Sequence, residues 1–282
     1  MEALIEVEGL AAALGDPDWV VIDCRFDLLD PEAGAKQYAE AHIPGARHAN
    51  LDRDLAREPG PEDGRHPLPR PEDFAARLEA LGVSNSSVVV AYDEGAGALA
   101  ARLWWMLRWL GHERVAVLNG GLARWKAAAL PLTERPQRCE RGSFVPERVN
   151  GDWIVSTAEL EDRMRTGDLI LDARAAARFR GEQEPIDRVA GHVPGAANLP
   201  FTECLAGDGR LLPQSELRTL LANATDGRDA GQVITMCGSG VTACHLLLAM
   251  NSAGLGDGRL YVGSWSEWIR DPERRIATGD EA

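Results

Sequence analysis

The stretch VVIDCR at residues 20–25 recurs as LILDAR at residues 169–174, and this repetition decides the fold. A His-x-Pro-Gly-Ala turn follows in each copy, as AHIPGA at residues 41–46 and GHVPGA at residues 191–196. The period is roughly 150 residues, far longer than the repeat of a solenoid. The sequence therefore predicts two copies of one domain, each with its own core.

The downstream parts of the two copies also correspond. NGGLARW at residues 119–125 matches VGSWSEW at residues 262–268, and short β-branched runs alternate with helix-like stretches such as residues 98–110. This alternation predicts an α/β fold in which each copy is a mostly parallel sheet flanked by helices. We expect domains at residues 1–135 and 153–282, joined by a linker at residues 136–152 that is rich in Pro and Gly.

Composition excludes several classes of protein. The formal net charge of -14 over 282 residues argues against binding to nucleic acid or to an anionic membrane, because both need a basic surface. No apolar run is long enough for a membrane span and the N-terminal residues lack the basic region of a signal peptide, so a cytoplasmic location is expected. The five cysteines form no Cys-x-x-Cys pair, so neither a disulfide framework nor a metal site is expected, and no cofactor is implied.

Cys237 is the candidate nucleophile. It opens the run CGSGVTA at residues 237–243, after the apolar stretch QVITM and before a helix-like stretch from Cys244 to Met250. In this arrangement backbone N–H groups and the positive end of a helix dipole point at the sulfur, and they favour the nucleophilic thiolate.

These motifs resemble the tandem-domain rhodanese-like sulfurtransferases over nearly the whole chain. The loop around Cys237 is similar to the branch that uses 3-mercaptopyruvate, since thiosulfate-preferring members place basic residues where this chain has Gly238 and Ser239. The resemblance implies a persulfide on Cys237, with pyruvate released and the sulfur passed to cyanide or a thiol, either a small thiol or a thioredoxin-like protein. The first copy has Tyr92 and Asp93 at the corresponding place, so only the second copy is expected to be catalytic.

The resemblance also implies roles for individual residues. Ser239 is expected to form a proton relay with His66 and Asp52 of the first copy, so that the active site is shared between the two copies. Backbone amide groups of the loop are expected to surround the anionic sulfur. The loop residues expected to contribute them are Gly238, Gly240, Val241 and Thr242.

Two arginines are expected at the donor's carboxylate. Arg178 matches the family's first carboxylate-binding arginine. The second is expected nine residues later, but Asp187 stands there and Arg188 follows, so Arg188 is the candidate replacement.

Three other functions compete with this one. A Cys-dependent phosphatase would need an arginine at position 243, where the chain has Ala243. Thiosulfate sulfurtransferase activity is the main alternative, and a persulfide carrier without catalytic activity is the second.

Overall fold

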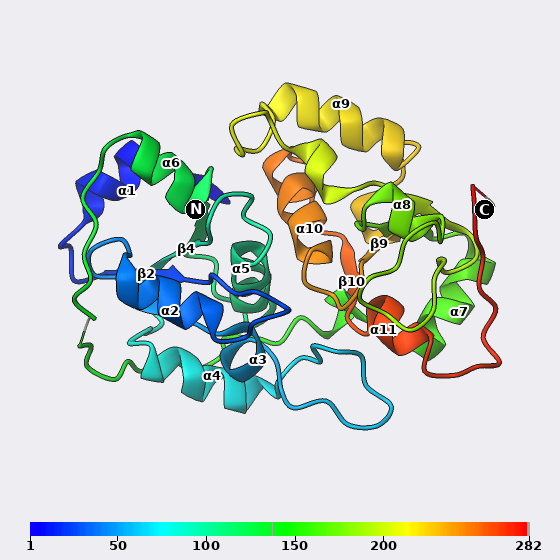
Figure 1. Cartoon of the computed structure of the whole chain (residues 1–282), viewed down its shortest axis with the longest axis horizontal. Helices are drawn as coiled ribbons and strands as arrows, with labels where there is room; N and C mark the ends of the chain where they lie inside the picture. The colour runs from blue at the N-terminus through cyan, green and yellow to red at the C-terminus, as the bar shows by residue number, and fades with distance from the viewer. Residues whose placement is uncertain (137, 281–282) are drawn as a thin grey trace. The chain divides into compact units, whose positions relative to one another are not determined.

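The computed structural model describes residues 1–136 and 138–280, and the chain forms two compact units (Figure 1). The first unit comprises residues 1–57, 68–150 and 206–211, and the second comprises residues 58–67, 151–205 and 212–282. The segment 58–67 thus belongs to the second unit, although it connects two helices of the first.

The first unit is a five-stranded parallel sheet with flanking helices. The strands lie in the order β1-β5-β4-β2-β3, and every pair is parallel. Their bounds are β1 Leu4–Ile5, β2 Trp19–Asp23, β3 Arg47–His48, β4 Val88–Tyr92 and β5 Val115–Leu118. The helices are α1 Val7–Ala13, α2 Ala33–Glu40, α3 Leu51–Asp54, α4 Pro71–Ala80, α5 Ala100–Trp109 and α6 Gly121–Ala127. Leu10 of α1 and Trp125 of α6 join Val21 and Val90 of the sheet in one apolar core.

The second unit repeats this plan with strand order β6-β10-β9-β7-β8. Its strands are β6 Ile154–Val155, β7 Leu169–Asp172, β8 Ala196–Asn198, β9 Val233–Met236 and β10 Arg259–Tyr261. Its helices are α7 Thr157–Thr166, α8 Ala176–Phe179, α9 Gln214–Ala224, α10 Ala243–Ser252 and α11 Ser264–Trp268, with 3-10 turns η1 Gly151–Trp153, η2 Phe201–Cys204 and η3 Ala230–Gln232. Leu160 of α7 and Trp265 of α11 pack with Ile170 and Ile234 in its core.

Both sheets have the same order, namely the first, fifth, fourth, second and third strand of each unit. A one-residue slip in the pairing of two strands would turn every side chain of one strand to the opposite face of the sheet. Both units must therefore place their apolar residues in the same pattern along the corresponding strands. The prediction of two α/β domains with parallel sheets is confirmed.

The two repeated motifs hold each other in place. In the second unit Asp172 and Arg174 form a buried ion pair of 2.6 Å, and Arg174 Nη2 donates to the carbonyl of Gly191, the residue before His192. His192 then stacks on Phe179, with ring centroids 3.7 Å apart. In the first unit Arg25 likewise bonds Asp23 and the carbonyl of Ala41, before His42. Both motifs therefore serve the fold: the arginine fixes the end of a central strand to the following turn.

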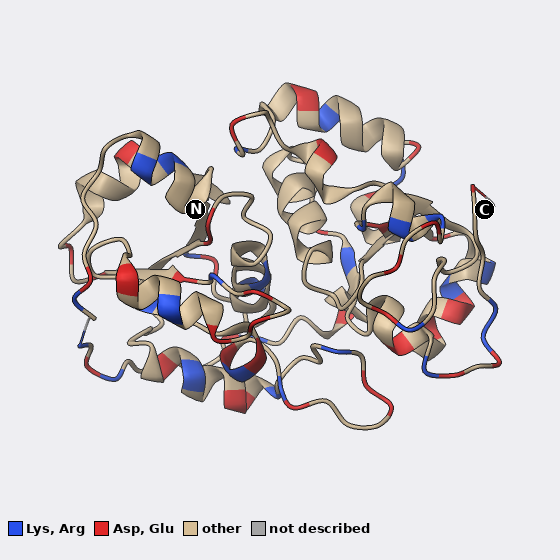
Figure 2. Ribbon diagram, viewed as in Figure 1, with Lys and Arg blue, Asp and Glu red and all other residues tan. Residues whose placement is uncertain are grey.

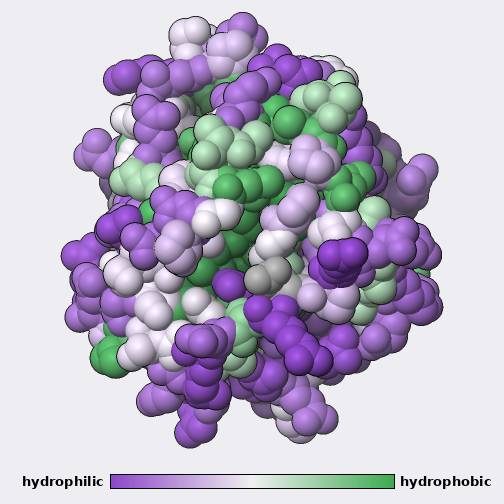
Figure 3. All heavy atoms as spheres, turned by 90° about the vertical axis from the view of Figure 1, so that its left-hand side faces the viewer, coloured by the Kyte–Doolittle hydropathy of each residue, from purple (hydrophilic) through white to green (hydrophobic). Residues whose placement is uncertain are grey.

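Charged side chains of both signs lie on helices of both units, for example on α4 and α7 (Figure 2). One face of the molecule shows hydrophilic residues around a central band of hydrophobic ones (Figure 3). Among the described residues, no helix is long and apolar enough to cross a membrane.

Candidate functional site

Cys237 lies directly after β9, where a short loop leads into α10. Its side chain is buried, with 2% of the residue exposed. The backbone N–H of Cys237 donates to Ser264 Oγ at 3.1 Å, and its carbonyl accepts from the N–H of Trp265 at 3.0 Å. The cysteine is thus clamped by the first turn of α11.

The loop after Cys237 turns sharply at Gly240. This residue has a φ of +75°, and a Cβ there would lie 2.5 Å from the carbonyl oxygen of Val262. Only glycine fits such a backbone conformation and such a close approach. Val241 and Thr242 complete the turn, and Thr242 is the N-cap of α10. The predicted strand, loop and helix around the cysteine are therefore present.

Ser239 and His66 meet in this loop. His66 Nδ1 and Ser239 Oγ are 2.7 Å apart, and both residues are buried. They are separated by 173 positions in the sequence. Both residues belong to the second unit, which includes the segment 58–67.

The segment carrying His66 is fixed by backbone contacts to α11 and the turn before it. The N–H of Arg65 donates to Ser266 Oγ at 2.9 Å, and Arg270 Nε donates to the carbonyl of Asp63 at 3.2 Å. A Cβ on Gly64 would lie 2.4 Å from the carbonyl oxygen of Gly263, so only glycine allows the two backbones to approach this closely.

Arg178 lies beside Gly238 of the loop, held by two carboxylates. Its Nη2 is 2.8 Å from Glu184 and 3.1 Å from Asp187. Burial alone would raise the pKa of Glu184, but hydrogen bonds from Arg178 and from backbone N–H groups outweigh burial and hold that pKa below its usual value. Both carboxylates therefore lock the guanidinium in one orientation.

Arg65 is a further cationic residue of this site, and the sequence interpretation missed it. Its Nη1 forms an ion pair of 2.7 Å with Asp187, the same carboxylate that binds Arg178. A Cβ on Gly238 would lie 3.3 Å from Arg65 Nη2 and 3.6 Å from Arg178 Nη2. Two guanidinium groups therefore flank the residue after Cys237. The available hint in the sequence was that Arg65 directly precedes His66.

Arg188 makes its contacts outside this cluster of arginines and carboxylates. Arg188 Nη2 donates to the carbonyl of Ile269 at 2.6 Å, so its guanidinium binds the end of α11. Asp52 belongs to the first unit, in α3, where its backbone N–H donates to the side chain of Asn50 at 2.9 Å.

Two further cysteines of the chain are buried away from this loop, and burial raises the pKa of each. Burial raises the pKa of the Cys24 thiol well above its usual value, and the nearby Asp23 raises it further. Burial also raises the pKa of Cys204 to about 12, with a smaller contribution from Glu203. Both therefore stay as thiols at neutral pH. Within residues 1–136 and 138–280, no group of His, Cys, Asp and Glu side chains could hold a metal ion.

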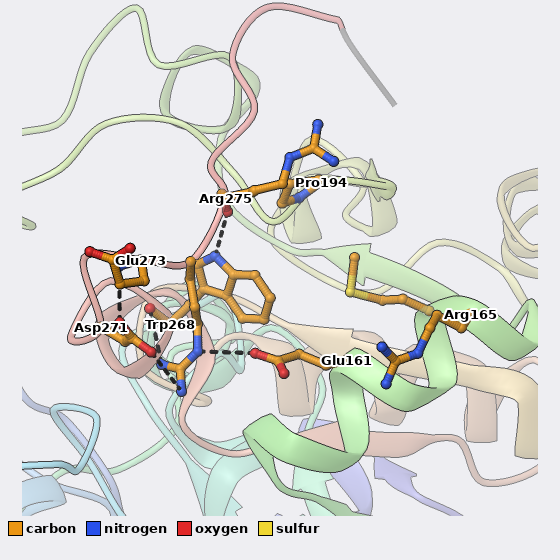
Figure 4. A pocket seen from close by; sticks show the side chains of 9 residues that line it. Glu161, Arg165, Pro194, Trp268, Asp271, Glu273 and Arg275 are labelled. Carbon is orange, nitrogen blue, oxygen red and sulfur yellow. Dashed lines mark hydrogen bonds and ion pairs between the residues drawn. The ribbon is translucent and has the colours of Figure 1, made fainter.

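The second unit also has a surface hollow of about 430 Å³ near Trp268 and Pro194 (Figure 4). None of the predicted site residues lines it. Its Arg274 is bonded to Glu161 at 3.2 Å, with Asp271 nearby (Figure 4). It is a charged hollow separate from the cysteine loop.

Comparison with known protein families identifies both halves of the chain. The model of the rhodanese-like domain matches residues 6–128 and again residues 156–271. The chain belongs to the rhodanese-like family. Each matched stretch contains one copy of the repeated motifs and four of the five strands of one sheet, and β1 and β6 lie just before the two stretches.

Relatives of this rhodanese-like chain match it over almost its full length. A probable 3-mercaptopyruvate sulfurtransferase from Pseudomonas aeruginosa is 49% identical over 280 residues, which is 98% of each chain. A putative thiosulfate sulfurtransferase from Mycobacterium tuberculosis is 36% identical over 285 residues, covering 97% of this chain and 95% of the relative. The crystal structure of SseA from Escherichia coli, described as a 3-mercaptopyruvate sulfotransferase, superposes with a TM-score of 0.81 at 35% identity, over 94% of this chain and 100% of SseA.

Proposed function

We propose that this chain is a sulfurtransferase that takes sulfur from 3-mercaptopyruvate onto Cys237 and passes it to a thiol or to cyanide. The observation that carries the proposal is the 2.7 Å contact between His66 and Ser239, two residues after the buried Cys237. A donor that carries a thiol proton needs a path for that proton, and a hydroxyl bonded to an imidazole supplies one.

The first half-reaction balances as follows. The Cys237 thiolate attacks the sulfur of 3-mercaptopyruvate, a sulfur–sulfur bond forms, and the carbon–sulfur bond breaks. The electron pair of that bond leaves on carbon as the enolate of pyruvate. The donor's thiol proton passes by way of Ser239 and His66 to this carbon, leaving pyruvate and a deprotonated persulfide. Asp52 is retained as a member of the relay on the strength of the family resemblance.

In the second half-reaction an acceptor thiolate or cyanide attacks the outer sulfur of the persulfide. The Cys237 thiolate leaves and is ready for another donor. We place small thiols and thioredoxin-like proteins among the acceptors, since the chemistry needs only an accessible thiolate. Support for the anionic persulfide comes from α10, whose N-terminus follows the loop and favours negative charge there.

Thiosulfate is the second candidate donor. Two guanidinium groups beside Gly238 also suit a dianion, and one close relative is described as a putative thiosulfate sulfurtransferase. Steady-state kinetics with both donors and cyanide as acceptor separate the two activities. We expect a higher kcat/KM with 3-mercaptopyruvate; a higher value with thiosulfate would establish the alternative, and turnover of neither would favour a carrier.

A further inference from the structure

We propose that Arg65 is the second guanidinium that binds the carboxylate of the sulfur donor. This inference rests on the proposed function, because it concerns a donor that carries a carboxylate at the same site. It assigns a specificity-determining role to a residue in the segment 58–67, outside the Cys237 loop and outside β7 to α8, where Arg178 lies.

Arg178 already uses most of its hydrogen-bond donors on carboxylates. Its Nε and Nη2 both bond Glu184, and Nη2 also bonds Asp187. Its Nη1 lies toward the loop, 3.7 Å from where a Cβ on Gly238 would be. A carboxylate has two oxygens and is held best by two parallel N–H donors. A second donor group is therefore needed to fix the orientation of the substrate.

Arg65 supplies that group from another segment of the chain, residues 58–67. Its Nη1 is bound to Asp187, while its Nη2 is the atom closest to the Cβ position of Gly238, at 3.3 Å. A quarter of its side chain is exposed, 26%, whereas the side chain of Asp187 is only 4% exposed. One nitrogen of the arginine is thus anchored to Asp187, and the other lies beside Gly238, the residue after Cys237.

Asp187 explains why the second arginine comes from another segment. An acidic side chain cannot bind a carboxylate, but it bridges Arg65 and Arg178 at 2.7 and 3.1 Å. Glu184 also binds Arg178, so each of the two guanidinium groups is paired with a carboxylate before a donor arrives. The bridge holds the two guanidinium groups at a fixed separation, so less entropy is lost when a carboxylate binds between them.

Gly238 keeps the space between the guanidinium groups open. Any side chain at this position would begin 3.3 to 3.7 Å from Arg65 and Arg178 and would occupy the place of a small anion. Arg188, the candidate from the sequence, is instead bound to the carbonyl of Ile269. Arg65 also adjoins His66, so the same segment delivers the group that orients the donor and the imidazole that moves its proton.

The test is steady-state kinetics of Arg65→Gln with 3-mercaptopyruvate, beside Arg178→Gln and the control Arg180→Gln. Arg180 is a more exposed arginine of the same unit, paired with Glu182. Losing a charge-assisted hydrogen bond lowers kcat/KM by roughly ten- to a hundredfold. We expect Arg65→Gln to show this loss mainly through KM, with competitive inhibition by pyruvate weakened to a similar degree and Arg180→Gln unchanged.

Arg270→Gln shows the effect of loosening the segment 58–67 without removing Arg65. It removes the bond to the carbonyl of Asp63 but leaves both guanidinium groups beside Gly238. If Arg65→Gln acted only by displacing His66, kcat would fall, pyruvate inhibition would stay, and Arg270→Gln would behave in the same way. That result overturns the inference. The reaction of Cys237 with neutral iodoacetamide should be unchanged in Arg65→Gln, which shows that the loop is intact.

The outcomes separate this inference from the proposed function. If Arg178→Gln loses activity while Arg65→Gln keeps both its KM and its pyruvate inhibition, the role of Arg65 is wrong and the proposed function stands. If the unmodified protein does not turn over 3-mercaptopyruvate, the proposed function itself fails. A gain-of-function variant strengthens the test: Asp187→Arg placed in Arg65→Gln should recover part of the lost kcat/KM, because it restores a second guanidinium.

Discussion

The loop after β4 in the first unit and the loop after β9 in the second share one backbone arrangement, or frame, but the residue that opens each loop differs. Asp23 pairs with Tyr92 in the first sheet, and Asp172 pairs with Met236 in the second, so Asp93 is the counterpart of Cys237. The turns that clamp them agree as well: Leu122 N–H donates to Asp93, and Trp265 N–H to Cys237.

In the first unit this frame surrounds a carboxylate of the chain itself, that of Asp93. The Asp93 carboxylate accepts four backbone N–H bonds of 2.9 to 3.2 Å, from Gly95, Gly97, Leu99 and Ala100. This frame therefore directs N–H groups at a negative charge placed just after the strand. In the second unit the same position carries the Cys237 sulfur, which is the atom expected to become anionic as thiolate and as persulfide. The comparison indicates that the frame is an anion cradle, occupied internally in one copy and by the reacting sulfur in the other.

Cys237→Ser gives the largest expected effect. It removes the sulfur while keeping a side chain of similar size, so turnover with either donor should fall below detection. Mass spectrometry of donor-treated protein should find the added sulfur on the peptide with Cys237. Cys24 and Cys204 serve as internal controls, since burial raises the pKa of both thiols. Added sulfur found mainly on either of them contradicts the comparison of the two loops.

His66→Ala is expected to have the second largest effect on turnover. Loss of one general acid–base group typically slows a reaction on the order of a hundred- to ten-thousandfold. We expect a loss in this range with 3-mercaptopyruvate and a smaller one with thiosulfate, which has no thiol proton to move. Ser239→Ala should follow the same pattern because its hydroxyl is bonded to His66. Equal losses with both donors would mean that His66 acts on the loop rather than on the proton.

Much of this site was predictable because the informative residues lie in contiguous motifs. Cys237 was found from a strand, a small-residue loop and a helix, a pattern that local sequence carries by itself. Arg65 and Ser264 were missed for two physical reasons. The contacts of Arg65 depend on a segment that joins the second unit, with a hydrogen-bond partner 201 positions away. The role of Ser264 depends on its backbone angle, which no motif states.

Asp93→Asn tests whether the four N–H bonds to the Asp93 carboxylate stabilise the first unit. Asparagine keeps the size of aspartate, but its NH2 group would face two of the N–H donors, leaving them unsatisfied and buried. Such losses cost roughly 2–4 kcal/mol of the free energy of unfolding, which chemical denaturation measures. Asp226→Asn, at a side chain that is 90% exposed, is the matched control. A loss no larger than that of the control would show that the four bonds do not stabilise the loop.

The same variant has a defined dependence on pH. Burial raises the pKa of Asp93 despite its four N–H bonds. The folded state therefore binds this proton more tightly than the unfolded state does, and stability falls as pH rises from about 4, the usual value for Asp, through the raised pKa. The stability advantage of wild type over Asp93→Asn should shrink across that window. Glu184→Gln should show the opposite trend, because the pKa of Glu184 is lowered: the advantage of wild type should grow as pH rises toward about 4.3.

Substitutions of Ser264 are expected to change stability least, and they compare one matched position of the two units. Its counterpart is Gly121, and the φ angles are +53° and +56°. A left-handed backbone costs a non-glycine residue roughly 1–2 kcal/mol. Ser264 keeps this strained conformation while its Oγ accepts the N–H of Cys237 at 3.1 Å and donates to the carbonyl of Tyr261 at 2.9 Å.

Two substitutions separate the strain from the hydrogen bond. Ser264→Ala keeps the strain and loses the hydroxyl, so it should destabilise the protein by about 1 kcal/mol, the typical net value of one hydrogen bond. Ser264→Gly loses the same hydroxyl but relieves the strain, so its stability should stay within about 1 kcal/mol of wild type and exceed that of Ser264→Ala. Both variants should slow the alkylation of Cys237 equally, since both release its N–H. If Ser264→Gly reacts as fast as wild type, the serine does not position the cysteine. The first copy's glycine would then have served equally well in the second.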